Sequence, residues 1–136
     1  MTHVLIIDDE AMIRDVLTQA LTERGFQISS AANGREGFEL CCREPPQIII
    51  TDLLMPDGEG LEAIRRLKRE FPSIRIIAIS GGYRSGNIDL LETAATMGAD
   101  RTFAKPVSLR RLITAIEELT PPQEGGQLSA TRPTKS

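Results

Sequence analysis

The alternation of short apolar runs with longer amphipathic stretches is the feature that most constrains how this chain can fold. The apolar runs are rich in Ile and Val, as strands buried on both faces of a parallel sheet are. They lie at residues 4–7, 26–30, 48–51, 74–79 and 102–104. Between them, apolar residues recur at helical spacing and predict helices over about 11–24, 34–43, 60–70, 87–97 and 109–119. Regular βα alternation predicts a parallel sheet with helices on both faces, and five units are too few for a closed eight-stranded barrel. We therefore expect a doubly wound α/β fold with a five-stranded sheet.

Local signals place the ends of several of these helices. Asn33 and Ser108 are of the residue types that cap helix N-termini, and Gly25 and Gly98 stand where a helix would stop. The first helix is predicted to bury one apolar stripe, made of Ile13, Val16, Leu17, Ala20 and Leu21.

Length, charge and cysteine content narrow the class of protein. A chain of 136 residues is long enough for one domain with a real core, and a net charge of −3 gives no strong attraction to nucleic acid or anionic lipid. Met1 is not followed by a secretory signal, and no apolar run approaches the roughly 20 residues that span a bilayer. The adjacent Cys41 and Cys42 are expected to be reduced thiols, which favours a cytoplasmic location.

Residues 1–119 are predicted to form the folded domain. Residues 120–136, rich in Pro, Gly, Ser and Thr, are predicted to form a flexible tail with no output domain after it.

Acidic side chains follow two of the predicted strands at their carboxyl ends. Asp8 and Asp9 come after the first apolar run, and Asp52 comes after the third. Ligands of open parallel sheets bind at this edge. Two carboxylates about 4 Å apart repel by roughly 4 kcal/mol at an effective dielectric constant near 20, so three of them need compensation. Each acid alone is what an ordinary solvated turn contains. The three together predict a divalent cation site, with Mg²⁺ as the preferred ion.

Groups suited to a phosphoryl anion follow the fourth and fifth predicted strands. Lys105 can pair with a phosphoryl oxygen, Ser80 offers a hydroxyl, and Gly81 and Gly82 leave space beside it. A carboxylate can attack phosphorus and give an aspartyl phosphate. We assign Asp52 as the nucleophile because it is the single acid of the central strand, which leaves Asp8 and Asp9 as metal holders. The sequence does not decide whether the Lys105–Pro106 peptide is cis.

Five motifs, in this order and spacing, carry a family resemblance. They are VLIIDDE at 4–10, IIITDLLMPDGEGLE at 48–62, IAISGG at 77–82, MGAD at 97–100 and FAKPVS at 103–108. The chain resembles a bacterial two-component response-regulator receiver domain of the chemotaxis-regulator type, from about Thr2 to Leu119. This resemblance implies a flavodoxin-like sheet with strand order 2-1-3-4-5.

The resemblance also implies a role for each site residue. Asp52 would accept a phosphoryl group from a histidine kinase or a histidine phosphotransfer protein. Asp9 and Asp52 would bind Mg²⁺ directly and Asp8 largely through water, with the backbone carbonyl of Leu54 as the remaining protein ligand. Ser80 and Lys105 would bind the phosphoryl oxygens. The protein would be a phosphoacceptor that switches protein–protein contacts rather than an enzyme acting on a separate substrate. The exposed face of the last two helices would dock the partner; it includes Arg110, Arg111, Glu117 and Glu118.

The chain departs from the family pattern at three places. The position of the usual switch aromatic, three residues before the lysine, is Thr102, while Phe103 comes one later. The loop 81–87 is longer than in typical members, and its Tyr83 is a candidate replacement for that aromatic. Leu54 is apolar where the side chain influences hydrolysis of the phosphoaspartate, so slow dephosphorylation is expected.

Three other functions fit parts of the pattern. A haloacid-dehalogenase-like phosphatase would need a second Asp where Leu54 stands, and a flavodoxin-like cofactor binder would meet the negative charges of residues 8–10. A folded but unphosphorylated pseudo-receiver is the third. Within the leading interpretation the downstream role is open. It could be a flagellar or chemotaxis partner, a relay step, a phosphate sink, or control of a separate enzyme or kinase.

Overall fold

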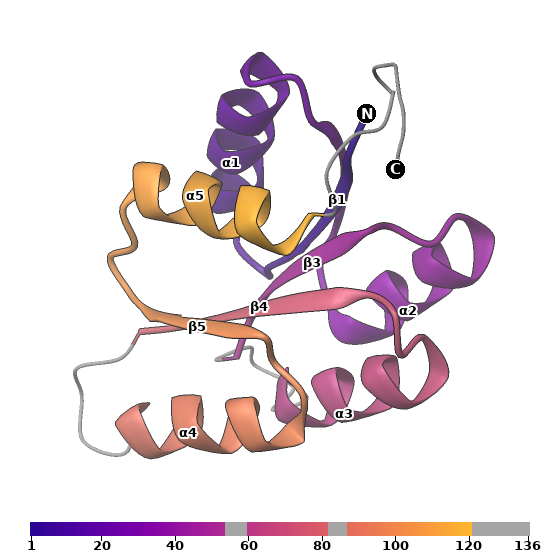
Figure 1. Ribbon diagram of the computed structural model, residues 1–136, viewed down its shortest axis with the longest axis vertical. Coiled ribbons are helices and arrows are strands. Elements are labelled where there is room, and N and C mark those ends of the chain that lie inside the picture. Colours follow the sequence, from indigo (N-terminus) through magenta and orange to yellow (C-terminus); the bar gives the residue numbers. More distant parts are fainter. Residues whose placement is uncertain (54–59, 82–86, 121–136) are drawn as a thin grey trace, which may run out of the picture.

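The chain forms a five-stranded parallel sheet between two layers of helices (Figure 1). The computed structural model describes residues 1–53, 60–81 and 87–120. The elements are β1 (His3–Ile7), α1 (Ala11–Glu23), β2 (Gln27–Ala31), α2 (Gly34–Arg43), β3 (Ile48–Asp52), α3 (Gly60–Glu70), β4 (Arg75–Ser80), α4 (Asn87–Met97), β5 (Arg101–Ala104) and α5 (Leu109–Leu119). The strand order is β2-β1-β3-β4-β5, with every neighbouring pair parallel. The predicted doubly wound sheet and its order are confirmed.

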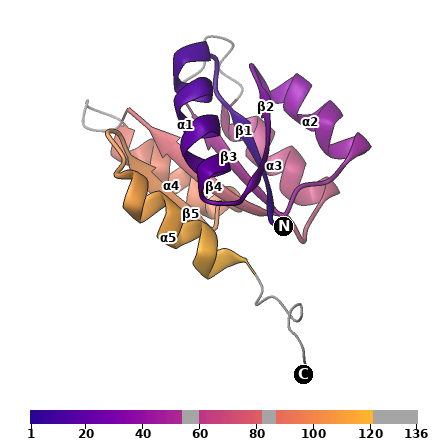
Figure 2. The same ribbon diagram turned by 90° about the horizontal axis from the view of Figure 1, so that it is seen from above.

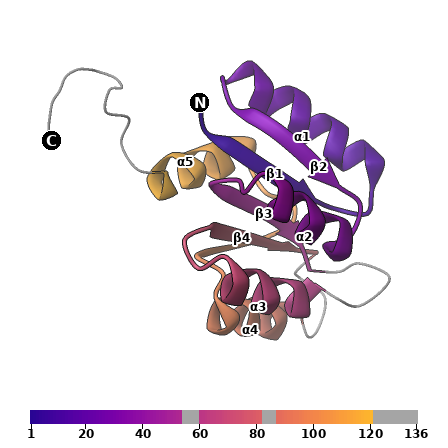
Figure 3. The same cartoon turned by 90° about the vertical axis from the view of Figure 1, so that its right-hand side faces the viewer.

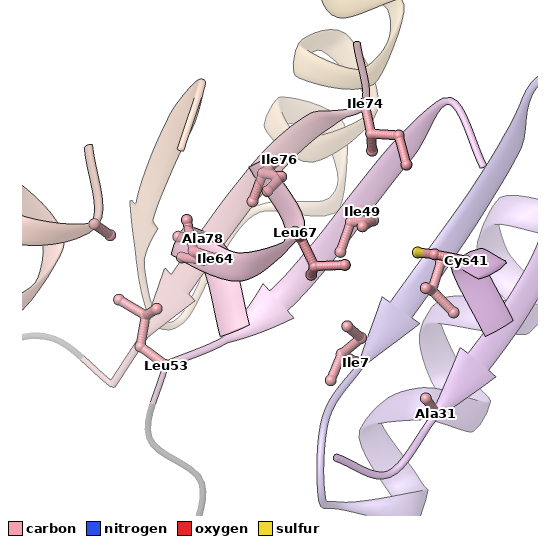
Figure 4. Packing of buried hydrophobic residues seen from close by; sticks show 12 residues of the cluster. Ile7, Ala31, Cys41, Ile49, Leu53, Ile64, Leu67, Ile74, Ile76 and Ala78 are labelled. Carbon is pink, nitrogen blue, oxygen red and sulfur yellow. The ribbon is translucent and has the colours of Figure 1, made fainter. Parts of the chain in front are cut away.

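Each face of the sheet has its own hydrophobic core, because successive side chains of a strand point to opposite faces. One core joins alternate residues of the central strands to α2, α3 and α4 (Figure 4). It includes Ile7, Ile49 and Ile76 of the sheet, with Cys41 of α2 and Leu67 of α3. The other core joins the residues between them to α1 and α5, and Figures 2 and 3 show these two helices on the opposite side of the sheet from α3 and α4. Burial on both faces explains why the strands are continuous apolar runs.

The predicted helix ends are confirmed. The Asn33 side chain accepts a hydrogen bond from the backbone N–H of Glu36 at 2.8 Å, and Ser108 Oγ accepts one from the N–H of Arg111 at 3.3 Å. Gly25 and Gly98 have φ angles of +96° and +127°. This left-handed region strains other residues, which is why glycine ends these two helices.

The predicted buried stripe of α1 is only partly correct, because Ile13, Leu17 and Ala20 are half-buried rather than buried. Leu21 is fully buried, but Val16 is 59% exposed, as is much of Leu109 on α5. On α4, Ala94 is buried whereas the neighbouring Ala95 is exposed. For Val16 and Leu109 the reason is the spacing of α1 and α5, which leave an open groove between them over the sheet. Helical periodicity identifies an apolar face but not how much of it a neighbouring helix covers.

The two cysteines are free thiols, as predicted. Cys41 is buried and Cys42 is exposed. Burial, together with the neighbouring Cys42, raises the pKa of the Cys41 thiol to about 11. No helix among the described residues has both the length and the apolar character needed to cross a membrane.

Candidate phosphoryl-transfer site

The carboxyl ends of four strands bring the predicted site residues together. Asp8 follows β1, Asp52 is the last residue of β3, Ser80 is the last residue of β4, and Lys105 follows β5. The backbone continues this alignment beyond the strands, since the N–H of Lys105 donates to the carbonyl of Ser80 at 2.7 Å. Parallel pairing therefore sets these side chains at one edge of the sheet, as the sequence predicted.

Asp8, Asp9 and Asp52 form one acidic cluster. Each offers a carboxylate oxygen, and these oxygens all lie within 4.8 Å of one another. Asp8 and Asp52 are only 4% and 5% exposed, whereas Asp9 lies at the surface. A set of carboxylate oxygens with an open side is the donor type that a hard divalent cation such as Mg²⁺ prefers, so the residues present fit this ion.

Lys105 is the cation that faces the acidic cluster. Its Nζ donates to Asp52 Oδ2 at 2.9 Å and lies 4.0 Å from Asp8 Oδ2. Burial by itself would lower the pKa of Lys105. The hydrogen bond and charge of Asp52, followed by the charges of Asp8 and Glu10, outweigh burial and raise the pKa. The lysine is therefore a fixed positive charge at neutral pH. The peptide between Lys105 and Pro106 is cis.

Within the cluster, Asp8 is a carboxyl group whose charged form is disfavoured, so its pKa is raised. Burial is the largest cause of its raised pKa, and the negative charges of Asp52 and Asp9 raise it further. The hydrogen bond from the N–H of Glu10 and the charge of Lys105 lower it by less. Bringing a buried acid next to two others is unfavourable unless positive charge is added, which a bound divalent cation would supply.

Ser80 has a fully buried hydroxyl whose oxygen makes no hydrogen bond within the described residues. An unsatisfied buried hydroxyl is uncommon, because leaving one costs on the order of 1–3 kcal/mol. Ser80 lies at the same edge of the sheet as Lys105, whose backbone N–H donates to the Ser80 carbonyl.

Two features of this site were not predicted from the sequence. Arg14 of α1 donates from its guanidinium to the backbone carbonyl of Asp8 at 2.6 Å. A groove of about 620 Å³ also runs between α1 and α5 to the site, lined mainly by apolar residues that include Met12, Val16 and Leu109. Asp52 and Lys105 lie at its polar end. The sequence shows that Met12 and Val16 are apolar, but it does not show that α5 leaves them exposed.

The departures from the family pattern are partly resolved. Phe103 pairs with Ile79 and packs in the core under α1 and α5, whereas Thr102 pairs with Ala78 of the opposite core. The aromatic ring is therefore on the face of the sheet away from α4. The predicted Leu54 carbonyl ligand, Gly82 and Tyr83 lie outside the described residues, as does the predicted tail from residue 121 onward.

Comparison with known proteins agrees with this architecture. A family model, the response regulator receiver domain, matches residues 4–117. A probable chemotaxis protein CheY of Rhizobium etli is 37% identical over 118 residues, covering 84% of this chain and 88% of that protein. Sporulation initiation phosphotransferase F of Bacillus subtilis is 29% identical over 118 residues, covering 87% of this chain and 93% of that protein.

A solved structure agrees over a similar length. The response regulator protein TrrA of Thermotoga maritima, in complex with Mg²⁺ and BeF, superposes with a TM-score of 0.76 at 28% identity. The match covers 88% of this chain and 100% of that one. Because the family model spans most of the sequence and these proteins match it over nearly their whole lengths, the chain belongs to the response regulator receiver domain family.

Proposed function

We propose that this protein is a phosphoacceptor of a two-component pathway, in which Asp52 takes a phosphoryl group and the modified protein changes its contacts with a partner. The observation that carries the proposal is the juxtaposition of three carboxylates within 4.8 Å with the Lys105 ammonium 2.9 Å from Asp52. A structural ion pair needs two groups, whereas this edge gathers three acids around a single lysine. The arrangement suits the transfer of a phosphoryl group from an anionic donor to a carboxylate, with the lysine offsetting the negative charge.

In this proposal Asp52 is the nucleophile. One of its carboxylate oxygens forms a bond to phosphorus while the bond from phosphorus to the donor breaks, and the leaving group keeps that electron pair. Lys105 and the Ser80 hydroxyl bind the phosphoryl oxygens and offset the charge that they carry. Asp8 and Asp9, with Asp52, would hold Mg²⁺. When bound, this ion neutralises the carboxylates and the transferred group.

The phosphodonor is proposed to be a phosphohistidine of a sensor kinase or of a phosphotransfer protein. The groove between α1 and α5 supports this assignment, because it ends at Asp52 and presents exposed apolar side chains beside a polar centre. A donor with an apolar helix could occupy the groove and bring its histidine to the carboxylate. The names of the Rhizobium and Bacillus relatives suggest two downstream roles, a chemotaxis partner and a relay step. The exposed α4 and α5 surface, with Arg110 and Glu117, is the proposed contact for that partner.

A direct test is phosphorylation by acetyl phosphate with Mg²⁺, read as intact mass. The wild type should gain one phosphoryl group, while Asp52→Asn should gain none. Asp15→Asn makes the same chemical change at an exposed position of α1 and should be phosphorylated like the wild type. If the wild type gains no mass and also fails to bind beryllofluoride, the protein is a pseudo-receiver and the proposal is wrong.

A further inference from the structure

Arg14 contacts the acidic site without touching the carboxylates through any described hydrogen bond. It lies in the second turn of α1, is partly buried, and donates from NH1 to the backbone carbonyl of Asp8 at 2.6 Å. Its own backbone N–H donates to the carbonyl of Glu10 at 3.1 Å, so the helix holds the arginine in register with the turn before it. A charge-assisted bond of this length is among the stronger hydrogen bonds in proteins.

This bond completes a set that fixes Asp8 from three directions. The N–H of Asp8 donates to the carbonyl of Ala31 at 3.1 Å, and Asp8 Oδ1 accepts from the N–H of Glu10 at 2.9 Å. With Oδ1 engaged, Oδ2 is the oxygen that faces Lys105 across 4.0 Å. Asp8 lies beyond the end of β1, where the sheet no longer holds the backbone carbonyl. Arg14 supplies the partner that a neighbouring strand would otherwise provide.

We propose that Arg14 is a positioning residue for the divalent cation site: by holding the carbonyl of Asp8, it fixes the backbone from which that carboxylate is presented. This inference rests on the proposed function, since it concerns the same acidic cluster. Groups that orient metal ligands without binding the metal typically change affinity by 10- to 100-fold when they are removed.

The sign of the effect separates positioning from simple electrostatics. Arg14 carries a positive charge close to a cluster that should bind a cation. If charge were its only influence, removing it would tighten Mg²⁺ binding. If positioning dominates, removing it weakens Mg²⁺ binding in spite of the lost repulsion. A role confined to stability would lower the melting temperature and leave the affinity unchanged.

The experiment measures Mg²⁺ affinity by calorimetry on the full chain for the wild type, Arg14→Ala and Arg14→Lys, with thermal unfolding of each. Arg14→Ala should weaken the affinity roughly tenfold, at the lower end of that range. Arg14→Lys keeps the charge and one donor, so it should recover part of the loss. Arg35→Ala is the matched control, because the Arg35 side chain is 76% exposed on α2 and pairs with Glu39 away from Asp8. The Mg²⁺ affinity of this variant should equal that of the wild type.

A second readout uses the rate of phosphorylation by acetyl phosphate. In Arg14→Ala the Mg²⁺ concentration for half-maximal rate should rise, while the rate at saturating Mg²⁺ should recover toward that of the wild type. Unchanged or tighter Mg²⁺ binding by Arg14→Ala would overturn the positioning role. Should that variant fail to fold, Arg14→Met, which keeps most of the side-chain length but has neither charge nor donor, decides the question by the same outcomes. Failure of the wild type to bind Mg²⁺ would instead refute the proposed function.

Discussion

Asp8 shows how the proposed function and stability oppose each other at the scale of one residue. Its carboxylate is buried beside Asp52, and its pKa is raised first by burial and then by the neighbouring acids. A carboxyl group whose pKa is higher in the folded protein than in the unfolded chain favours folding only while it is protonated. Its contribution is therefore present below the unfolded pKa near 3.8 and is lost as the pH rises through the folded pKa.

The first prediction follows from that sign. In EDTA at pH 7, Asp8→Asn should be more stable than the wild type by about 1 kcal/mol, within the range usual for relieving an unfavourable site. The gain should shrink as the pH is lowered through the raised pKa of Asp8, because the wild-type carboxyl then becomes protonated and neutral. Urea unfolding at several pH values measures it. Asp15→Asn, at an exposed position, should show no such pH-dependent gain, and a loss of stability in Asp8→Asn at pH 7 would contradict the argument.

Residue chemistry could be predicted from the sequence where the fold itself brings the groups together. Asp8, Asp52 and Lys105 follow strands, and parallel strands end at a common edge, so their meeting required only the strand order. Arg14 was not predictable in this way. It acts on a backbone carbonyl, which every residue has, and neither residue type nor spacing identifies that acceptor.

At the scale of elements, α3 approaches the end of β3 closely, next to Asp52, the proposed nucleophile. A Cβ placed on Gly60, the first residue of α3, would lie 2.5 Å from the carbonyl oxygen of Leu53 and 2.7 Å from its Cα. These are backbone atoms of the residue that follows Asp52, and they cannot move without moving the strand end. Gly60 is therefore required for this helix to start against the site.

The second prediction compares two glycines. Gly60→Ala should lower the free energy of unfolding by about 1–3 kcal/mol through overpacking, although Ala is the better helix former by about 1 kcal/mol. It should also slow phosphorylation by acetyl phosphate several-fold. Gly25→Ala meets no atom within 4 Å but has φ of +96°, so it should lose about 1 kcal/mol of stability and keep the wild-type rate. Equal rates for both variants would show that the Gly60 contact does not position Asp52.

The bounds of the helices and strands could be predicted because local sequence signals set them. The exposure of their side chains was harder to predict, because it depends on how neighbouring helices pack. Every strand and helix was predicted within two residues of its observed bounds, because caps, glycines and periodicity are local signals. The exposure of Val16 was not predicted, since it depends on the distance between α1 and α5, which the pattern of one helix does not contain. Alternation along β5 does predict that Thr102 and Phe103 face opposite sides, and the structure places the ring under α1 and α5.

At the scale of the whole molecule, the sheet connects the site to global stability. Its central strands carry site residues at their ends and core residues along their lengths, so a cation bound only by the folded protein must stabilise the whole domain. At a free concentration ten times the dissociation constant, that gain is about 1.4 kcal/mol.

The third prediction is that Mg²⁺ raises the melting temperature of the wild type, with a dependence on concentration that matches the affinity from calorimetry. Asp8→Asn should begin from a higher melting temperature in EDTA and gain much less from Mg²⁺, so the two proteins converge as the ion is added. Equal shifts in both proteins would mean that the stabilising ion binds elsewhere.

The bond between Lys105 and Asp52 has a consequence for timing as well as for charge. A carboxylate oxygen that accepts a hydrogen bond from an ammonium group at 2.9 Å holds its electrons more tightly and is a weaker nucleophile. In the proposed function, the same lysine favours the transfer once it also binds phosphoryl oxygens, because it offsets their negative charge. Lys105 therefore restrains Asp52, in the proposed function, until a donor brings phosphoryl oxygens that share the lysine, which limits stray phosphorylation between signals.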